Sequence, residues 1–107
     1  MKKSIMVIAA AAALGLAAQA NAAVDEAKAK SLAQSKNCFS CHAVDKKLVG
    51  PSLQDISKKY KGEAGAVANL AKKVKNGGSG AWGPIPMPPN PVSDDEAKLL
   101  VEWIMGM

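Results

Sequence analysis

The stretch Cys38-Phe39-Ser40-Cys41-His42 contains every cysteine and every histidine in the 107-residue sequence. Cysteines at this spacing occur in zinc sites, redox-active pairs and disulfides, so each of these must be considered. A structural zinc site needs four ligands, and these residues exhaust the supply of Cys and His. A thioredoxin-like pair needs a βαβ context, and no strand pattern precedes Cys38. A structural disulfide across so short a loop is sterically poor and gives His42 no role.

The remaining interpretation of Cys-x-x-Cys-His is covalent attachment of a c-type haem. Two thiols on one helical turn can each reach a vinyl group at one edge of the porphyrin and form a thioether. The histidine after the second thiol is then carried beneath the macrocycle, where its imidazole can bind the iron. The sequence therefore predicts one covalent haem, with Cys38 and Cys41 as attachment points and His42 as an axial ligand.

The second axial ligand must be another residue type, because His42 is the only histidine. Lysine is abundant, but its ammonium group is strongly hydrated. Met105 and Met107 lie at the C-terminus, whereas Met87 stands in a long loop, residues 76–92, that five prolines stiffen. This setting favours iron ligation by Met87 over the usual role of methionine as core filler. The five prolines are Pro84, Pro86, Pro88, Pro89 and Pro91.

Filled axial positions leave no site for oxygen or a substrate, which favours electron transfer over catalysis. A small haem enzyme or gas sensor is the alternative, and it requires an open or labile sixth position. A structural binding module without haem is a third possibility. The proline-rich loop could also act as a ligand of SH3-type domains, but such a role is not expected in an exported domain.

Hydrophobic periodicity predicts an all-α domain of about four helices, without an alternating strand pattern or an internal repeat. The expected helices span residues 24–36, about 53–60, 64–75 and 93–105. Gly77-Gly78 should stop the third helix. The fourth helix is the clearest, because Ser93 and Glu96 have the spacing of a capping box.

The N-terminal segment has the features of an export signal. Two lysines precede an uncharged, largely aliphatic run over residues 4–18, and Ala20-Asn21-Ala22 follows as a small-x-small cleavage site. The run is shorter than the ~20 residues of a membrane span, although an uncleaved anchor remains the alternative. We expect a cleaved signal peptide over 1–22, a domain over 23–107 with no membrane span, and a periplasmic location.

Without that segment the domain has a small core. Apolar residues make up 49% of the whole sequence, but only about 42% of residues 23–107, which is modest for a globular domain. A domain of this length commonly depends on a metal, disulfides or a partner. We therefore expect the haem to complete the core.

Charge gives a further indication about partners. The formal charge of +5 falls to +3 over residues 23–107, where lysines alternate with acidic residues. This pattern lacks the interleaved aromatic residues of a nucleic-acid-binding surface. Lys36, Lys46 and Lys47 flank the haem motif instead. We expect them to steer a monomeric protein onto acidic redox partners through a transient interface.

Four segments together resemble the bacterial class I cytochromes of the cytochrome c-551/c-552 type. They are Cys38-Phe39-Ser40-Cys41-His42, Val49-Gly50-Pro51, Trp82-Gly83-Pro84-Ile85-Pro86-Met87-Pro88-Pro89-Asn90 and Ser93-Asp94-Asp95-Glu96. The resemblance covers essentially the whole domain. It implies the small cytochrome c fold around one haem, with iron cycling between Fe(II) and Fe(III). A nitrite reductase, a terminal oxidase or other respiratory cytochromes are compatible partners.

The resemblance also implies roles for individual residues. Its axial ligands would be His42 and Met87, and its thioether ligands Cys38 and Cys41. The Pro51 carbonyl would accept a hydrogen bond from His42 Nδ1, which fixes the ring. Asn90 would hydrogen-bond near the Met87 sulfur, and Trp82 would donate to a haem propionate. Taken alone, Pro51 could belong to an ordinary turn, Asn90 could be a turn residue, and Trp82 could be core.

One position departs from the pattern of related proteins. These often carry an arginine in the third helix near the propionates, and here the matching position is Lys73. The sequence contains no arginine, so a bidentate contact with a propionate cannot form. We therefore expect solvent to reach that propionate and to affect the pH dependence of the reduction potential.

Overall fold

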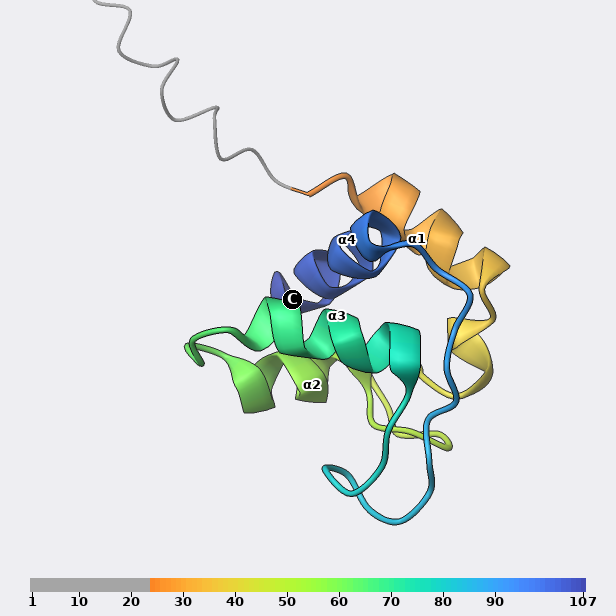
Figure 1. The fold of residues 1–107 in the computed structure, drawn as a ribbon, viewed down its shortest axis with the longest axis vertical. Coiled ribbons are helices and arrows are strands. Elements are labelled where there is room, and N and C mark those ends of the chain that lie inside the picture. Colours follow the sequence, from red (N-terminus) through yellow and green to blue (C-terminus); the bar gives the residue numbers. More distant parts are fainter. Residues whose placement is uncertain (1–23) are drawn as a thin grey trace, which may run out of the picture.

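The computed structural model describes residues 24–107 of the chain. These residues form four α-helices and one 3-10 turn (Figure 1). They are α1 (Glu26–Ser35), the turn η2 (Cys38–Ser40), α2 (Leu53–Tyr60), α3 (Ala66–Asn76) and α4 (Asp94–Met105). Within these residues no strand forms, and none of the helices is both long and apolar enough to cross a membrane. The predicted all-α domain of four helices is confirmed. The expected signal peptide, residues 1–22, lies outside the described residues.

Helix α4 is the element on which the other three helices pack. Figure 1 shows it in dark blue against α1, with α3 alongside. The main cluster of buried apolar residues consists of Ala29, Ala33, Leu53, Val92, Ala97, Leu100 and Trp103. Phe39 extends this core from η2, because its ring meets the Trp103 ring edge-on at a centroid distance of 6.5 Å. Alanines are three of these seven buried residues, so the cluster contains few large side chains.

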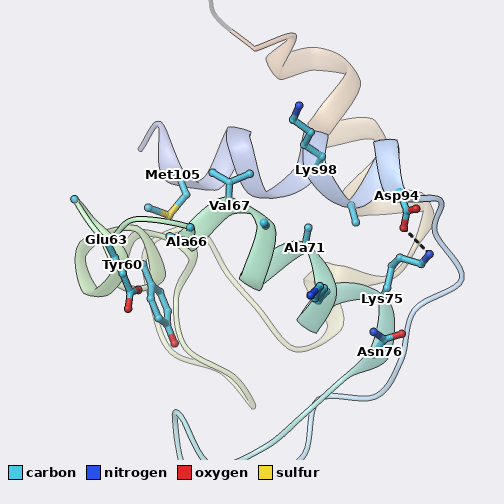
Figure 2. A pocket seen from close by; sticks show the side chains of 15 residues that line it. Tyr60, Glu63, Ala66, Val67, Ala71, Lys75, Asn76, Asp94, Lys98 and Met105 are labelled. Carbon is cyan, nitrogen blue, oxygen red and sulfur yellow. Dashed lines mark hydrogen bonds and ion pairs between the residues drawn. The ribbon is translucent and has the colours of Figure 1, made fainter.

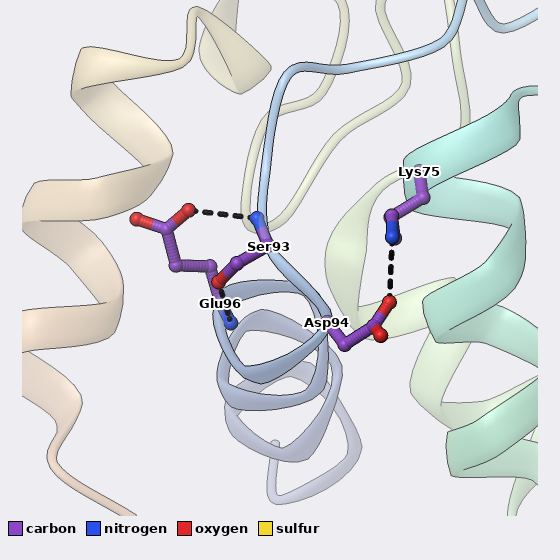
Figure 3. A network of polar contacts seen from close by, with 4 residues as sticks. All are labelled: Lys75, Ser93, Asp94 and Glu96. Atoms are coloured by element: carbon purple, nitrogen blue, oxygen red, sulfur yellow. Dashed lines mark hydrogen bonds and ion pairs between the residues drawn. The ribbon is translucent and has the colours of Figure 1, made fainter.

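The predicted capping box begins α4 (Figure 3). Ser93 Oγ accepts a hydrogen bond from the Glu96 amide at 3.1 Å, and Glu96 Oε1 accepts one from the Ser93 amide at 2.9 Å. The bond from the Ser93 amide lowers the pKa of the Glu96 carboxyl. Lys75 Nζ lies 2.6 Å from Asp94 Oδ1 and joins the end of α3 to the start of α4.

Glycines set both ends of α3. The helix begins at Ala66, two residues later than predicted, because Gly65 precedes it with φ +78°, a left-handed conformation outside the helix. It ends as predicted at Gly77, whose φ is +77° and whose amide donates to the Lys73 carbonyl at 2.7 Å. The direction of the chain after α3 therefore depends on Gly77.

A buried serine connects α2 to the far end of α4. Ser57 is 3% exposed. Its hydroxyl lies 3.4 Å from the Met105 carbonyl oxygen and 3.2 Å from the Met107 carbonyl oxygen. Carbonyls at a helix C-terminus lack partners within the helix, so this hydroxyl satisfies groups that would otherwise be unpaired.

Candidate haem site

The Cys-x-x-Cys-His segment follows α1 after a reversal at Asn37, which has a left-handed φ of +62°. Its residues form the tight turn η2, in which the amides of Cys41 and His42 donate to the Cys38 carbonyl at 3.2 Å and 3.0 Å. Both cysteines are half-buried free thiols. The structure thus places both thiols on one turn with His42 directly after it.

The Cys38 thiol lacks the acidity of a redox-active cysteine. Burial is the main reason that its pKa is raised. Reactive Cys-x-x-Cys pairs instead have a lowered pKa that supplies a thiolate near neutral pH. The shift of the Cys38 pKa is therefore opposite in direction to that of a reactive pair.

His42 is oriented by a carbonyl and a glycine. Its Nδ1 lies 2.8 Å from the Pro51 carbonyl oxygen. A carbonyl only accepts hydrogen bonds, so Nδ1 is the donor, and in the neutral imidazole Nε2 then keeps a lone pair available for a metal. A Cβ on Gly50 would lie 2.7 Å from His42 Cε1, so only glycine leaves room for the ring here. Sequence reasoning gave Gly50 no role of its own, because this close approach exists only in the folded chain.

The loop that carries Met87, residues 77–92, is called the methionine loop here. It is closed by a reciprocal pair of backbone hydrogen bonds. The Met87 amide donates to the Gly78 carbonyl at 2.7 Å, and the Gly78 amide donates to the Met87 carbonyl at 3.0 Å. A Cβ on Gly77 would lie 2.5 Å from the Met87 carbonyl oxygen and 2.9 Å from the Pro89 nitrogen. Gly77 therefore both ends α3 and allows the methionine loop to pass close to it. Sequence reasoning found only the first of these roles.

Asn90 fastens the far side of the same loop to α3. Its Nδ2 donates to the Val74 carbonyl at 2.9 Å and to the Pro88 carbonyl at 3.2 Å. Its backbone amide donates to the Lys75 carbonyl at 3.3 Å. Asn90 is thus more than a turn residue. Its hydrogen bond near the Met87 sulfur stays a prediction.

Trp82 is 44% exposed, so it is not a core residue. Lys59 Nζ lies over its ring, 4.7 Å from the centroid. Lys73, the predicted counterpart of the family's arginine, is half-buried and runs beside Gly78, because a Cβ there would lie 3.2 Å from Lys73 Cε. The contact between Trp82 and a propionate stays a prediction.

The donor set and the exposed apolar side chains fit a haem group. An imidazole nitrogen, a thioether sulfur and two adjacent thiols are the groups that a covalently bound, hexacoordinate haem requires. Large exposed apolar side chains in the described chain are Leu48, Val49, Trp82, Ile85 and Met107. All but Met107 lie in the loops after His42 and before Met87, which project to the same side of α3 in Figure 1. Large exposed apolar side chains are typical of a ligand or partner site.

A separate groove lies between α3 and α4 (Figure 2). Its floor includes Ala66, Ala71 and Ala97, and Lys98 lies at its rim. None of the residues Cys38–His42 lines it, nor does Met87. The groove is therefore distinct from the candidate haem site.

The sequence model of the family described as Cytochrome c matches residues 26–107. The chain belongs to the cytochrome c family. Cytochrome c-551 of Pseudomonas aeruginosa is 55% identical over 75 residues, which cover 70% of this chain and 72% of that protein. Cytochrome c-552 of Hydrogenobacter thermophilus is 50% identical over 78 residues, which cover 73% of this chain and 80% of that protein. The crystal structure of wild-type cytochrome c552 from Nitrosomonas europaea matches with a TM-score of 0.70 at 51% identity, covering 72% of this chain and 96% of that chain.

These similarities confirm the predicted type and fold: this is a class I c-type cytochrome of the cytochrome c-551/c-552 type. It transfers electrons and is not an enzyme. Its cofactor is one covalently bound haem c.

Proposed function

We propose that this cytochrome is a periplasmic carrier that passes single electrons between respiratory redox proteins. In this proposal Cys38 and Cys41 form the thioether bonds, and His42 and Met87 are the axial ligands. The haem supplies an iron that alternates between Fe(II) and Fe(III). The chain's own residues bind and orient the group and control access to it.

The observation that best supports this assignment is the contact of 2.8 Å between His42 Nδ1 and the Pro51 carbonyl. In the neutral imidazole it fixes the tautomer with the proton on Nδ1, which leaves Nε2 free. Gly50 then allows the ring to lie close to the backbone, since a Cβ would lie 2.7 Å from its Cε1 atom. A ligand held in this way needs little rearrangement when the charge of the iron changes, which suits rapid electron transfer.

Met87 is held by different means. Its backbone is paired with Gly78, and Asn90 fastens the following residues to α3. A sulfur ligand fixed in this way closes the sixth position to oxygen and substrates, and a thioether raises the reduction potential relative to a second histidine.

The surface after His42 is suited to a transient acidic partner. Leu48 and Val49 are exposed apolar residues, and Lys46 and Lys47 precede them directly. An apolar centre beside basic residues gives a small interface with electrostatic steering. We expect electron-transfer rates with acidic partners to fall as ionic strength rises, and rates that do not fall would contradict this docking surface. Stopped-flow reduction against a nitrite reductase, a terminal oxidase and respiratory cytochromes would identify the partner.

The export part of the proposal depends on residues 1–22 acting as a cleaved signal peptide. Mass spectrometry of the protein from periplasmic extracts tests it. A mature chain that begins near Ala23 and carries one haem supports the proposal, and a chain that retains these residues contradicts it.

The ligand assignment has a direct optical test. Ferric protein should show the weak far-red absorption band of iron bound by methionine sulfur, and Met87→Ala should abolish it. Met105→Ala is the matched control and should retain the band. Reduced native protein that binds carbon monoxide readily would instead show an open or labile sixth position and contradict ligation by Met87. A pyridine haemochrome assay should find one covalent haem per chain.

A further inference from the structure

Lys59 lies in the last turn of α2 and contacts the methionine loop across 22 residues of sequence. Its Nζ donates a hydrogen bond to the Ala81 carbonyl at 3.1 Å. The same Nζ lies 4.7 Å from the centroid of the Trp82 ring and 5.8 Å from that of Tyr60. One ammonium group thus contacts two consecutive residues of the loop, one through a hydrogen bond and one through a cation–π interaction.

The part of the loop that Lys59 contacts has few other attachments. Gly80 and Gly83 have φ values of +101° and +122°, and a Cβ on either would meet nothing within 4 Å. The Gly80 amide donates to the Gly83 carbonyl at 2.9 Å, a bond internal to the loop. Among the described residues, Lys59 is the only hydrogen-bond partner of segment 79–86 that lies outside that segment. Met87 follows this segment directly.

We propose that Lys59 is the positioning residue for the loop that supplies the sixth ligand. It holds Ala81 and Trp82 against α2 and thereby limits how far the segment before Met87 can swing away from the iron. Gly78 and Asn90 fix the segments on either side of this stretch. The inference deepens the proposed function and rests on its assignment of Met87 as the ligand.

The test is the rate at which imidazole replaces the sixth ligand in the ferric holoprotein, followed by loss of the far-red band. Lys59→Met keeps the aliphatic stem but removes the ammonium group. Loss of a hydrogen bond and a cation–π contact at an exposed site should raise the rate roughly tenfold. Lys58→Met is the matched control, since Lys58 is the exposed neighbour on α2, and it should leave the rate unchanged. Lys59→Arg keeps both the charge and the hydrogen-bond donors, so imidazole should bind to this variant as slowly as to the wild type.

Guanidinium unfolding of the same variants separates positioning from general stability. The proposal requires that Lys59→Met raise the rate of imidazole binding by a larger factor than it raises the equilibrium constant for unfolding. It is overturned if Lys59→Met behaves like Lys58→Met, if both constants rise by the same factor, or if Lys59→Arg does not restore the slow rate. A wild-type protein without the far-red band would instead overturn Met87 ligation itself, so the two failures are distinguishable.

Discussion

His42 and Met87 are held in the fold by contacts of different range. In the segment that contains His42, each hydrogen bond joins residues that are at most ten positions apart in the sequence, as Leu53 and Ala43 are. The loop around Met87 instead depends on bonds from its two sides to α3 and on one bond to α2. One ligand is therefore built mostly from neighbouring residues, whereas the position of the other depends on how the helices are assembled.

The difference indicates which side of the iron opens first. The proposed thioethers tether the His42 side covalently, while the Met87 side has only hydrogen bonds and close packing. Local opening occurs where contacts are few and exposed. We therefore expect the bond to the Met87 sulfur to break under conditions in which His42 remains bound.

Gly77→Ala should have the largest effect. The new Cβ would lie 2.5 Å from the Met87 carbonyl, at a φ of +77° that disfavours alanine. Overpacking and left-handed strain together should cost about 2–4 kcal/mol and release the sulfur ligand at lower temperature. Thermal unfolding and the far-red band measure these effects. Gly80→Ala is the control for conformation alone, because its φ is also positive but its Cβ meets nothing within 4 Å; an equal loss there would contradict the packing argument.

Gly50→Ala perturbs the opposite side of the iron. Its Cβ would meet His42 Cε1 at 2.7 Å, and its φ is not in the left-handed region, so only packing is affected. We expect a loss of about 1–3 kcal/mol in the free energy of unfolding. The rate of imidazole entry should stay near that of the wild type. Gly106→Ala, where the nearest atom lies 3.5 Å away, is the control. If Gly50→Ala opened the Met87 side, the two ligands would not be held independently.

Asn90→Ala tests the attachment of the methionine loop to α3. It removes the hydrogen bonds of Nδ2 to Val74 and Pro88. The expected cost is about 1–2 kcal/mol, with faster imidazole binding than in the wild type. Asn69, an exposed residue in the first turn of α3, provides the control Asn69→Ala. Equal rates in the two variants would show that Asn90 does not restrain Met87.

The smallest effect should come from the start of α4, outside both ligand segments. The pKa of Glu96 is lowered in the folded protein by the Ser93 amide, so ionised Glu96 stabilises the fold. This contribution is complete above the ordinary glutamate pKa of about 4.3 and is lost as the pH falls through the lower folded value. Glu96→Gln should make unfolding slightly less sensitive to acid, as denaturant titrations between about pH 6 and pH 3 can measure. An unchanged acid dependence would contradict this role, and the far-red band at neutral pH should not change.

The features that the sequence predicted are those set by neighbouring residues. The Ser93–Glu96 capping box lies within one helical turn, and Gly77 ends α3 through its own φ. The left-handed Asn37 and the 3-10 form of the cysteine turn were not predicted, because the end of the first helix at residue 36 does not specify the backbone geometry that follows it. Two close approaches, Gly50 to His42 and Gly77 to Met87, were also missed, since both depend on how loops fold back. The contact of Lys59 with the methionine loop had no signal at all, because its partners there, Ala81 and Trp82, are 22 and 23 residues away.

The serine that connects α2 to the end of α4 has a consequence for the order in which the chain folds. Ser57 and its acceptors are separated by 48 and 50 residues, and the whole methionine loop lies between them. Synthesis runs from the N-terminus, so the cysteine turn and α2 exist before the acceptors do. Contacts between residues so far apart close a long loop and carry a large entropic cost. The cysteine turn can therefore form early, through contacts between neighbouring residues. Ser57 can form its hydrogen bonds only after the methionine loop and α4 have been synthesised.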